Sequence, residues 1–195
     1  MSDNNVPKAE LRAVLRQRRD RFVSGLPGLR WQASMSQAIA HVVDQLSGAR
    51  CVAGFISLGS ELDPQDVLAA ATDMGIQTAL PWVRTQGEPM RFLRWTPGEP
   101  LSRGPYGLEQ PHEDAPEVSP DLIIVPLVGF DRHGGRLGQG AGYYDRALAR
   151  IPSARTIGFA WSVQEVERVP LDPWDIPLQA VATEAAFHSF VQELL

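Results

Sequence analysis

Cysteine and long apolar runs are both scarce in this sequence. Cys51 is the single cysteine among 195 residues, so an internal disulfide is excluded, and its place at the start of an apolar run predicts a packing role. No segment approaches the ~20 consecutive apolar residues that a membrane-spanning helix needs. The N-terminal residues lack the basic start and apolar block of a signal peptide. We therefore expect a cytoplasmic protein with no membrane partner.

Lysine is almost absent, and no sign of charge is in large excess. The net charge of -5 does not favour a nucleic-acid partner. Of the 18 basic residues only Lys8 is a lysine, which is explained either by chance or by a need for a compact ammonium at that position. Arginines gather within 12–21, where they are typical of a helix face in contact with solvent.

Apolar spacing divides the chain into alternating helices and strands. Helices are predicted where apolar residues recur at helical spacing, and buried strands where short apolar runs end at turn residues. The segment 97–120 shows neither pattern and is expected to be a long loop. The predicted helices are 8–22, 29–46, 60–75 and 143–151, and the predicted strands are 51–56, 76–80, 90–95, 122–125, 156–161 and 180–183.

The order of these elements indicates the fold class. Strands that are apolar on both faces and alternate with helices favour a mostly parallel sheet covered by helices. No internal repeat or low-complexity linker divides the sequence. The prediction is a single three-layer α/β/α domain that spans 1–195, a length at which one domain buries roughly 70% of its unfolded surface.

A glycine-rich stretch between the strand 122–125 and the helix 143–151 is the most informative segment. Because glycine has no Cβ, backbone N–H groups there can approach an anion closely. The start of the following helix adds partial positive charge, and Arg136 adds a full one. The stretch therefore predicts a phosphate site at the C-terminal end of a strand. Its glycines are Gly134, Gly135, Gly138, Gly140 and Gly142.

The spacing alone leaves the ligand of this stretch open. It contains neither the Gly-Lys-Ser/Thr of a P-loop nor the G-x-G-x-x-G of a dinucleotide site. A tight strand-to-helix turn without a ligand is the alternative. Asp145 favours the phosphate site, because a carboxylate beside phosphates can hold Mg²⁺ directly or through water.

Four segments in the same order resemble the 5-formyltetrahydrofolate cyclo-ligase family. The first is Arg136-Leu-Gly-x-Gly-x-Gly-Tyr-Tyr-Asp145, preceded by Pro-x-x-x-Phe-Asp-x-x-Gly. Lys8-Ala-Glu-Leu-Arg12 is similar to the family's N-terminal Lys-x-x-Leu-Arg. Phe55-Ile-Ser-Leu-Gly-Ser-Glu61 is similar to its Phe/Tyr-x-Ser-x-x-x-Glu segment. Trp174-Asp175-Ile-Pro-Leu resembles its late turn with an aspartate.

The resemblance implies a role for individual residues. Lys8 and Arg136 would be the catalytic residues, and Asp145 and Asp175 would hold Mg²⁺. Ile56, Glu61 and Tyr106 would line the folate pocket. From the residues alone, Glu61 also fits an exposed or helix-capping glutamate. Ala141 stands where relatives carry Lys or Gly, so it adds no charge there. The implied ATP-binding residues are Lys8, Arg12, Arg136, Leu137, Gly138, Gln139, Gly140, Ala141, Gly142, Tyr143 and Tyr144.

The implied reaction converts 5-formyltetrahydrofolate and ATP to 5,10-methenyltetrahydrofolate, ADP and phosphate. The γ-phosphoryl group activates the formyl oxygen, and a folate nitrogen then closes the ring. A positively charged glycine-rich loop with two aspartates suits this chemistry, which depends on positioning and charge neutralisation. The alternatives are a related ATP-using enzyme with another substrate and a non-catalytic nucleotide-binding module. We expect a monomer.

Overall fold

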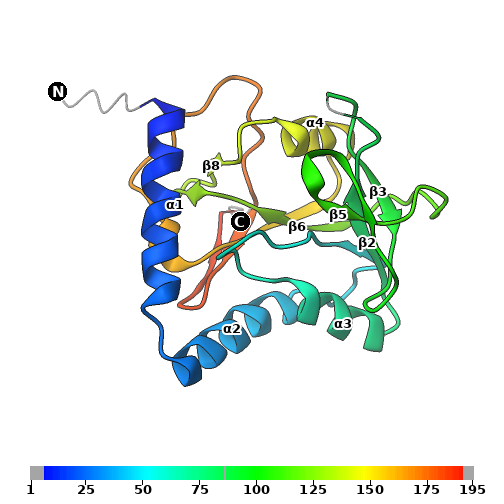
Figure 1. Ribbon diagram of the computed structural model, residues 1–195, viewed down its shortest axis with the longest axis horizontal. Coiled ribbons are helices and arrows are strands. Elements are labelled where there is room, and N and C mark those ends of the chain that lie inside the picture. Colours follow the sequence, from blue (N-terminus) through cyan, green and yellow to red (C-terminus); the bar gives the residue numbers. More distant parts are fainter. Residues whose placement is uncertain (1–6, 86, 191–195) are drawn as a thin grey trace, which may run out of the picture.

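A seven-stranded sheet forms the centre of the structure, a computed structural model in which residues 7–85 and 87–190 are described (Figure 1). The five strands from β10 to β2 run parallel, and the two edge strands, β11 and β3, are antiparallel to their neighbours. The predicted mostly parallel sheet is thus confirmed. In spatial order the strands are β11 (Phe187–Ser189), β10 (Ala180–Ala182), β9 (Arg155–Phe159), β6 (Leu122–Pro126), β1 (Cys51–Ala53), β2 (Gln77–Trp82) and β3 (Arg91–Arg94).

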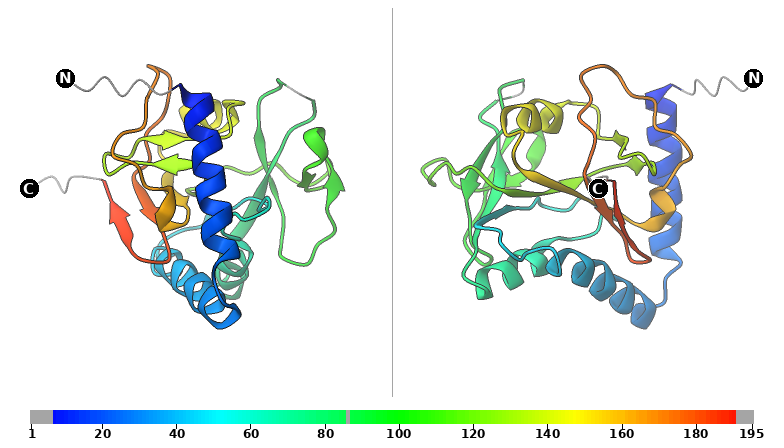
Figure 2. Two further views of the ribbon diagram at one scale, coloured as in Figure 1. Left: turned by 60° about the vertical axis from the view of Figure 1, so that its left-hand side comes forward. Right: turned by 180° about the vertical axis from the view of Figure 1, so that it is seen from behind.

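Helices cover both faces of this sheet and so produce three layers. Alternate residues of each strand point to opposite faces. Val52 therefore joins the core beneath α2 (Gly28–Val43) and α3 (Gln65–Asp73), whereas the next residue, Ala53, joins the core beneath α4 (Tyr143–Arg150). Both views of Figure 2 place α2 and α3 on the face opposite α4. The α/β/α architecture predicted from the sequence is confirmed.

Helix α1 (Lys8–Ser24) stands at one side of the sheet, away from both helical layers (Figure 1). Leu15 is fully buried there against Val128 and Leu137, which belong to the connection after β6. Near the other end of the helix, the Phe22 ring meets Trp161 edge to face at 5.6 Å. This packing fixes α1 beside the segments that follow β6 and β9. In the described part of the chain, no helix has the length and apolar character needed to span a membrane.

Short elements lie at the C-terminal edge of the sheet, where the parallel strands end. β7 (Gly129–Phe130) and β8 (Arg136–Leu137) form a small hairpin after β6, and η2 (Ser162–Gln164) follows β9. A second hairpin lies beyond β2 and consists of β4 (Ser102–Arg103), the short helix η1 (Pro105–Gly107) and β5 (Glu109–Gln110).

Three local predictions were wrong. The strand predicted over 76–80 continues through Pro81 to Trp82. The edge of β2 on which the Pro81 nitrogen lies faces β1, but Ala79 is the last residue that pairs with β1. The missing N–H of Pro81 therefore costs no hydrogen bond between strands. The helix expected from residue 60 starts only at Gln65. The segment 97–120 contains the β4–β5 hairpin, which docks on β2 because the Gln110 side chain hydrogen-bonds both backbone groups of Val83, at 3.1 and 3.2 Å.

Cys51 has the packing role expected of it. It is buried at the start of β1, and burial raises the pKa of its thiol to about 11, so the thiol remains neutral.

Asp121 ties the starts of β1 and β6 together and makes stability depend on pH. Its carboxylate accepts the N–H groups of Arg50 and Cys51, each at 3.1 Å, and pairs with the Arg50 side chain. Burial opposes ionisation, but these bonds hold the pKa of Asp121 below its usual 3.8. Because the folded pKa is depressed, the stabilisation is present above pH 3.8 and is lost as the pH falls through the folded pKa.

We expect Asp121→Asn to lower the free energy of unfolding by about 1 kcal/mol at pH 7. The difference from the parent should shrink as the pH falls below about 3.8, because the parent carboxylate is then protonated as well. Urea unfolding at pH 7 and at pH 3 measures both values. Asp114→Asn is the control, since that side chain is 86% exposed. An equal loss at both pH values would contradict the prediction.

Candidate active site

The glycine-rich connection after β6 is held in shape by a buried aspartate. Asp131 is 1% exposed, and its carboxylate accepts the N–H groups of His133, Gly135 and Val169 at 2.8–2.9 Å. Gly135 is required, since a Cβ there would lie 2.5 Å from the Asp131 carboxylate. Asp131 therefore shapes the turn and sets the starting direction of β8.

Arg136 projects from β8 into the protein and forms an ion pair with Asp145 in the first turn of α4. Its side chain is only 3% exposed, and its Nε has no hydrogen-bond partner among the described residues. The hydroxyl of Tyr144 is likewise buried without a partner there, and the Arg136 Cζ lies 6.0 Å from the Tyr144 ring centre. Unpaired buried donors are rare, and two at one site favour a role in which a ligand supplies the missing acceptor.

Burial raises the pKa of the Tyr144 phenol, although the Arg136 charge works against this shift. The phenol therefore keeps its proton at neutral pH. It is a hydrogen-bond donor, like the Nε of Arg136, and both donors suit an acceptor-rich ligand such as a phosphate.

Lys8, at the start of α1, lies between two aspartates from the loop that precedes β10. Its Nζ is 2.6 Å from a carboxylate oxygen of Asp172 and 2.6 Å from one of Asp175. Partial burial opposes the charge on Lys8, but these two contacts outweigh it and raise the pKa of the ammonium. Burial also opposes the charge on Asp175, whereas the hydrogen bonds from Lys8 and the Asp172 N–H lower the pKa of its carboxyl. Lys8 and Asp175 are therefore both charged at neutral pH.

The two aspartates predicted to bind metal lie close together. The N–H of Ile176, the residue after Asp175, donates to the same Asp145 oxygen that meets Arg136, at 3.2 Å. The hydrogen bonds of each carboxylate within the described chain fall on one oxygen, which leaves the other for a hard cation. The residues therefore fit Mg²⁺. No cluster of three or more His, Cys, Asp or Glu side chains arranged for a metal occurs within residues 7–85 and 87–190.

Three arginines of α1 turn toward the protein, so the solvent-facing prediction was wrong for Arg12, Arg16 and Arg19, whereas Arg18 and Arg21 are exposed as predicted. Arg12 Nε donates to the carbonyl of Gly138 at 2.8 Å, and Arg16 Nη2 donates to the Gln139 side chain at 2.5 Å. Arg19 is 6% exposed and bonds to Ser60 and Glu61. The spacing of Lys8, Arg12, Arg16 and Arg19 puts all four on one stripe of the helix. This stripe accounts for three of the five arginines in the segment 12–21.

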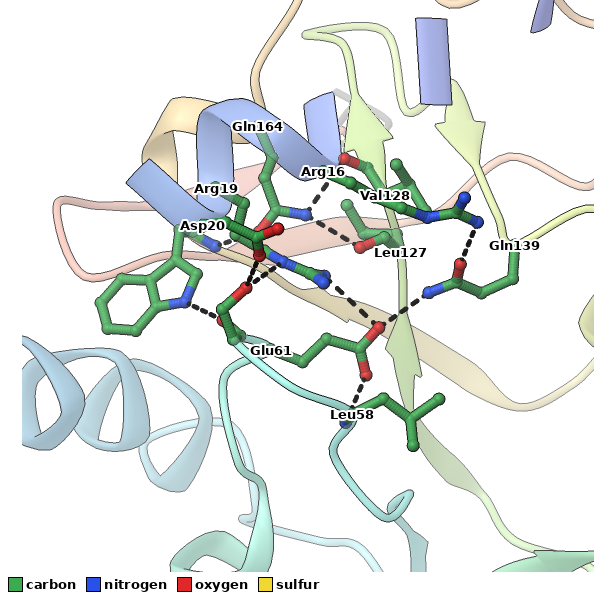
Figure 3. Close-up of polar contacts among 11 residues, drawn as sticks. Arg16, Arg19, Asp20, Leu58, Glu61, Leu127, Val128, Gln139 and Gln164 are labelled. Atoms are coloured by element: carbon green, nitrogen blue, oxygen red, sulfur yellow. Dashed lines mark hydrogen bonds and ion pairs between the residues drawn. The ribbon is translucent and has the colours of Figure 1, made fainter. Parts of the chain in front are cut away.

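Glu61 belongs to the connection after β1 and lies under the glycine loop, as Figure 3 shows. Its side chain is 6% exposed, which rules out the exposed or helix-capping alternative. One carboxylate oxygen meets Arg19 Nη1 at 3.4 Å and Gln139 Nε2 at 2.8 Å, and the other accepts the N–H of Leu58 at 3.0 Å. Segments far apart in the sequence, α1, the β1 connection and the glycine loop, therefore meet at one carboxylate.

The structure brings most of the predicted ATP-site residues together around the loop from Arg136 to Tyr144. Gly140 and Gly142 take left-handed conformations, with φ of 110° and 66°, which only glycine adopts freely. Ala141 is exposed within this loop. Tyr143 accepts the N–H of Gly87 at 3.0 Å and thereby links α4 to the β2–β3 connection.

The predicted folate residues are placed less completely. Ile56 is half-buried just beyond β1 and packs on the core beneath α2 and α3. The backbone of Tyr106 belongs to η1, but its side chain lies outside the described part. An open cavity of about 540 Å³ lies between the end of β2 and the β4–β5 hairpin that carries η1. It is lined in part by Trp82, Arg84 and Arg103.

Asp172, Arg19 and Gln164 are site residues that the sequence did not reveal. Asp172 shares Lys8 with Asp175, and two hydrogen bonds bring these residues together: the Asp175 N–H donates to the Asp172 carbonyl at 3.0 Å, and the Asp172 N–H donates to the Asp175 carboxylate at 2.8 Å. Gln164 is fully buried and donates to the carbonyls of Leu127 and Val128, which fixes the chain where it leaves β6. For Arg19, the one available signal was that it continues the series Lys8, Arg12 and Arg16, whose successive members are four, four and three residues apart.

A glycine-rich anion site at the C-terminal edge of a parallel sheet, flanked by cations and carboxylates, defines an α/β protein built to hold phosphate groups. Comparison with known proteins identifies the family: the sequence model of the 5-formyltetrahydrofolate cyclo-ligase family matches residues 4–184. This chain belongs to that family.

Individual relatives agree with this assignment. The chain is 37% identical over 142 residues to the 5-formyltetrahydrofolate cyclo-ligase of Escherichia coli K12, covering 69% of this chain and 78% of the relative. It is 30% identical over 195 residues to that of Mus musculus, covering 92% and 95%. It superposes on the structure of Aquifex aeolicus 5,10-methenyltetrahydrofolate synthetase with a TM-score of 0.79 at 29% identity, covering 96% and 95% of the two chains.

Proposed function

We propose that this protein converts 5-formyltetrahydrofolate and ATP to 5,10-methenyltetrahydrofolate, ADP and phosphate, as a 5-formyltetrahydrofolate cyclo-ligase. Family membership supports the reaction. The observation that carries the phosphoryl-transfer half is the pair of buried donors, Arg136 Nε and Tyr144 Oη, beside a glycine-rich loop. A γ-phosphate would satisfy both donors and meet the positive charges of Arg136, Arg12 and Lys8.

The formyl oxygen is a poor leaving group until it is phosphorylated. Transfer of the γ-phosphoryl group onto this oxygen forms a C–O–P linkage and releases ADP. The neighbouring folate nitrogen then attacks the activated carbon, the ring closes, and phosphate leaves with the oxygen. Arg136 and Lys8 would stabilise the charge on the transferred group, which is the main demand of phosphoryl transfer. Leu137 to Tyr144 would wrap the nucleotide.

Asp145 and Asp175 would hold Mg²⁺, which neutralises charge on the phosphates when it is bound. Their proximity and their available oxygens support this assignment. Because Arg136 and Lys8 are the present partners of these carboxylates, they would lie beside the metal and would turn toward phosphate oxygens when it binds.

The folate would occupy the space between the β1 connection and the β4–β5 hairpin. In the register of β1 and β2, Ala53 lies beside Ala79, so the chain at Ile56 and at Trp82 leaves the sheet at the same level. This shared level supports a folate site that would extend toward Ile56 from the cavity beyond β2, whose lining residues lie within 82–85 and 102–113. Glu61 would hydrogen-bond the pterin ring, and Tyr106 would lie at the hairpin side of the substrate.

We further propose that the chain acts as one domain, as a monomer and in the cytoplasm. The single sheet supports one catalytic unit. No observation favours either an unrelated substrate or a non-catalytic nucleotide-binding role.

The turnover assay tests the function directly. Purified protein mixed with 5-formyltetrahydrofolate and Mg-ATP should generate the absorbance of methenyltetrahydrofolate, together with ADP in equal amount. Omission of either substrate is the control. ATP binding without any folate product would refute the proposed substrate and support a different ATP-using enzyme.

A further inference from the structure

Most of the hydrogen-bonding capacity of the Glu61 carboxylate is already used within the protein, since three donors meet a group with about four acceptor sites. Gln139 Nε2 donates to one carboxylate oxygen at 2.8 Å, and Arg19 reaches the same oxygen at 3.4 Å (Figure 3). The second oxygen is taken by the Leu58 N–H. Arg19 belongs to α1, and Leu58 belongs to the same connection after β1 as Glu61. Gln139 is different, because it comes from the glycine loop.

The Gln139 amide imitates a ligand. It presents an N–H group to Glu61 as a ring N–H of a folate would, while Arg16 holds its carbonyl oxygen at 2.5 Å. Gln139 is exposed and is flanked by Gly138 and Gly140, so the backbone on both sides can turn. Its contact with Glu61 can therefore break without disturbing the sheet.

We propose that Gln139 is a coupling residue: it occupies Glu61 in the substrate-free enzyme and leaves it when the loop closes on ATP, so that the two substrates bind cooperatively. The inference rests on the proposed function, in which the loop binds ATP and Glu61 binds folate. A protein whose binding-competent state is only partly populated shows an affinity reduced by that fraction. Nucleotide binding that draws Gln139 away from Glu61 would raise the fraction of the protein that is competent to bind folate.

Gln139→Ala should therefore tighten the binding of 5-formyltetrahydrofolate to the nucleotide-free enzyme by about three- to tenfold, the effect of removing one competing hydrogen bond. In the parent, a non-hydrolysable ATP analogue with Mg²⁺ should strengthen folate binding by a similar factor. In Gln139→Ala the analogue should have little further effect. By thermodynamic reciprocity, folate should strengthen binding of the analogue in the parent alone.

Equilibrium dialysis of 5-formyltetrahydrofolate, with and without the analogue, measures all four affinities on the full chain. Gln139→Asn is a second variant, since its shorter amide cannot reach both partners, and it should behave like the alanine variant. Gln17→Ala, an exposed glutamine on α1, is the matched control and should behave like the parent.

Weaker folate binding in Gln139→Ala would mean that Gln139 contacts the folate, and equal coupling in parent and variant would mean that it transmits nothing; either result overturns the inference. Absence of turnover in the parent would instead refute the proposed function. The two failures are thus distinguishable.

Discussion

Replacement of Arg136 by alanine is expected to lower kcat of the folate reaction at least ~100-fold, because one buried donor to a transferred phosphoryl group is worth several kcal/mol in the transition state. The Arg136 side chain is 3% exposed and carries the unpaired Nε at the site. Asp145→Ala should produce a loss of similar size, since Asp145 orients Arg136 and is a proposed Mg²⁺ ligand.

Removal of one partner leaves the other charged and poorly solvated, so each single variant could also lose stability. Arg136→Lys separates the two effects: it keeps the charge beside Asp145 but lacks the planar fork, and it should remain folded while turnover stays at least ~10-fold below the parent. Arg132→Ala is the matched control, because that neighbouring arginine is 72% exposed and bonds only to Glu165 within the described chain. Initial rates and urea unfolding should be measured on each variant. Near-parent turnover in both Arg136→Ala and Asp145→Ala would refute the loop assignment.

Lys8→Met should lower kcat by about 100-fold, with a smaller change in KM for folate. The ammonium is expected to act on the phosphates, and along α1 it lies far from Arg19, the residue that contacts Glu61. The raised pKa of Lys8 means that the group is charged throughout the neutral range, so this effect should not vary between pH 6 and pH 9. Lys8→Arg should restore only part of the rate, since a planar guanidinium cannot place its charge as an ammonium does.

The control for Lys8 is Asp172→Asn, which removes one of its two carboxylate partners at a position that is 45% exposed. If loss of the ion pairs were responsible for the slow rate of Lys8→Met, this variant, which loses one of the two pairs, would show a substantial part of the same loss. Rates measured against ATP and against folate separately would show this. Equal rates for Lys8→Met and the parent would remove Lys8 from the site.

The sequence was most informative where chemistry depends on local spacing. Glycines at fixed intervals, followed by Asp145, were enough to predict the anion loop, because conformational freedom and close approach are properties of the residues themselves. The alternation of apolar segments likewise predicted the layered sheet. These features need no knowledge of distant contacts.

Features that depend on tertiary neighbours were missed. Pro81 lies in a strand because β1 has already ended beside it, which no local pattern reveals. The β4–β5 hairpin depends on Gln110 and its two bonds to Val83. From the sequence, Arg19 was predicted to face solvent, but in the structure the connection that carries Ser60 and Glu61 packs on it. Each miss reflects a partner more than 20 residues away or the end of a neighbouring strand.

The stripe of cations on α1 has a consequence for the geometry of the reaction. Lys8 and Arg19 are separated by 11 residues, about 16 Å along a straight helix. A helix is stiff over this length, so α1 acts as a ruler that sets the separation between the proposed metal end and the proposed folate end of the site. One residue inserted in the middle of α1 would turn half of the stripe by about 100° and lengthen the ruler by about 1.5 Å. Every residue of the stripe would remain present, yet the two halves of the site would no longer be in register.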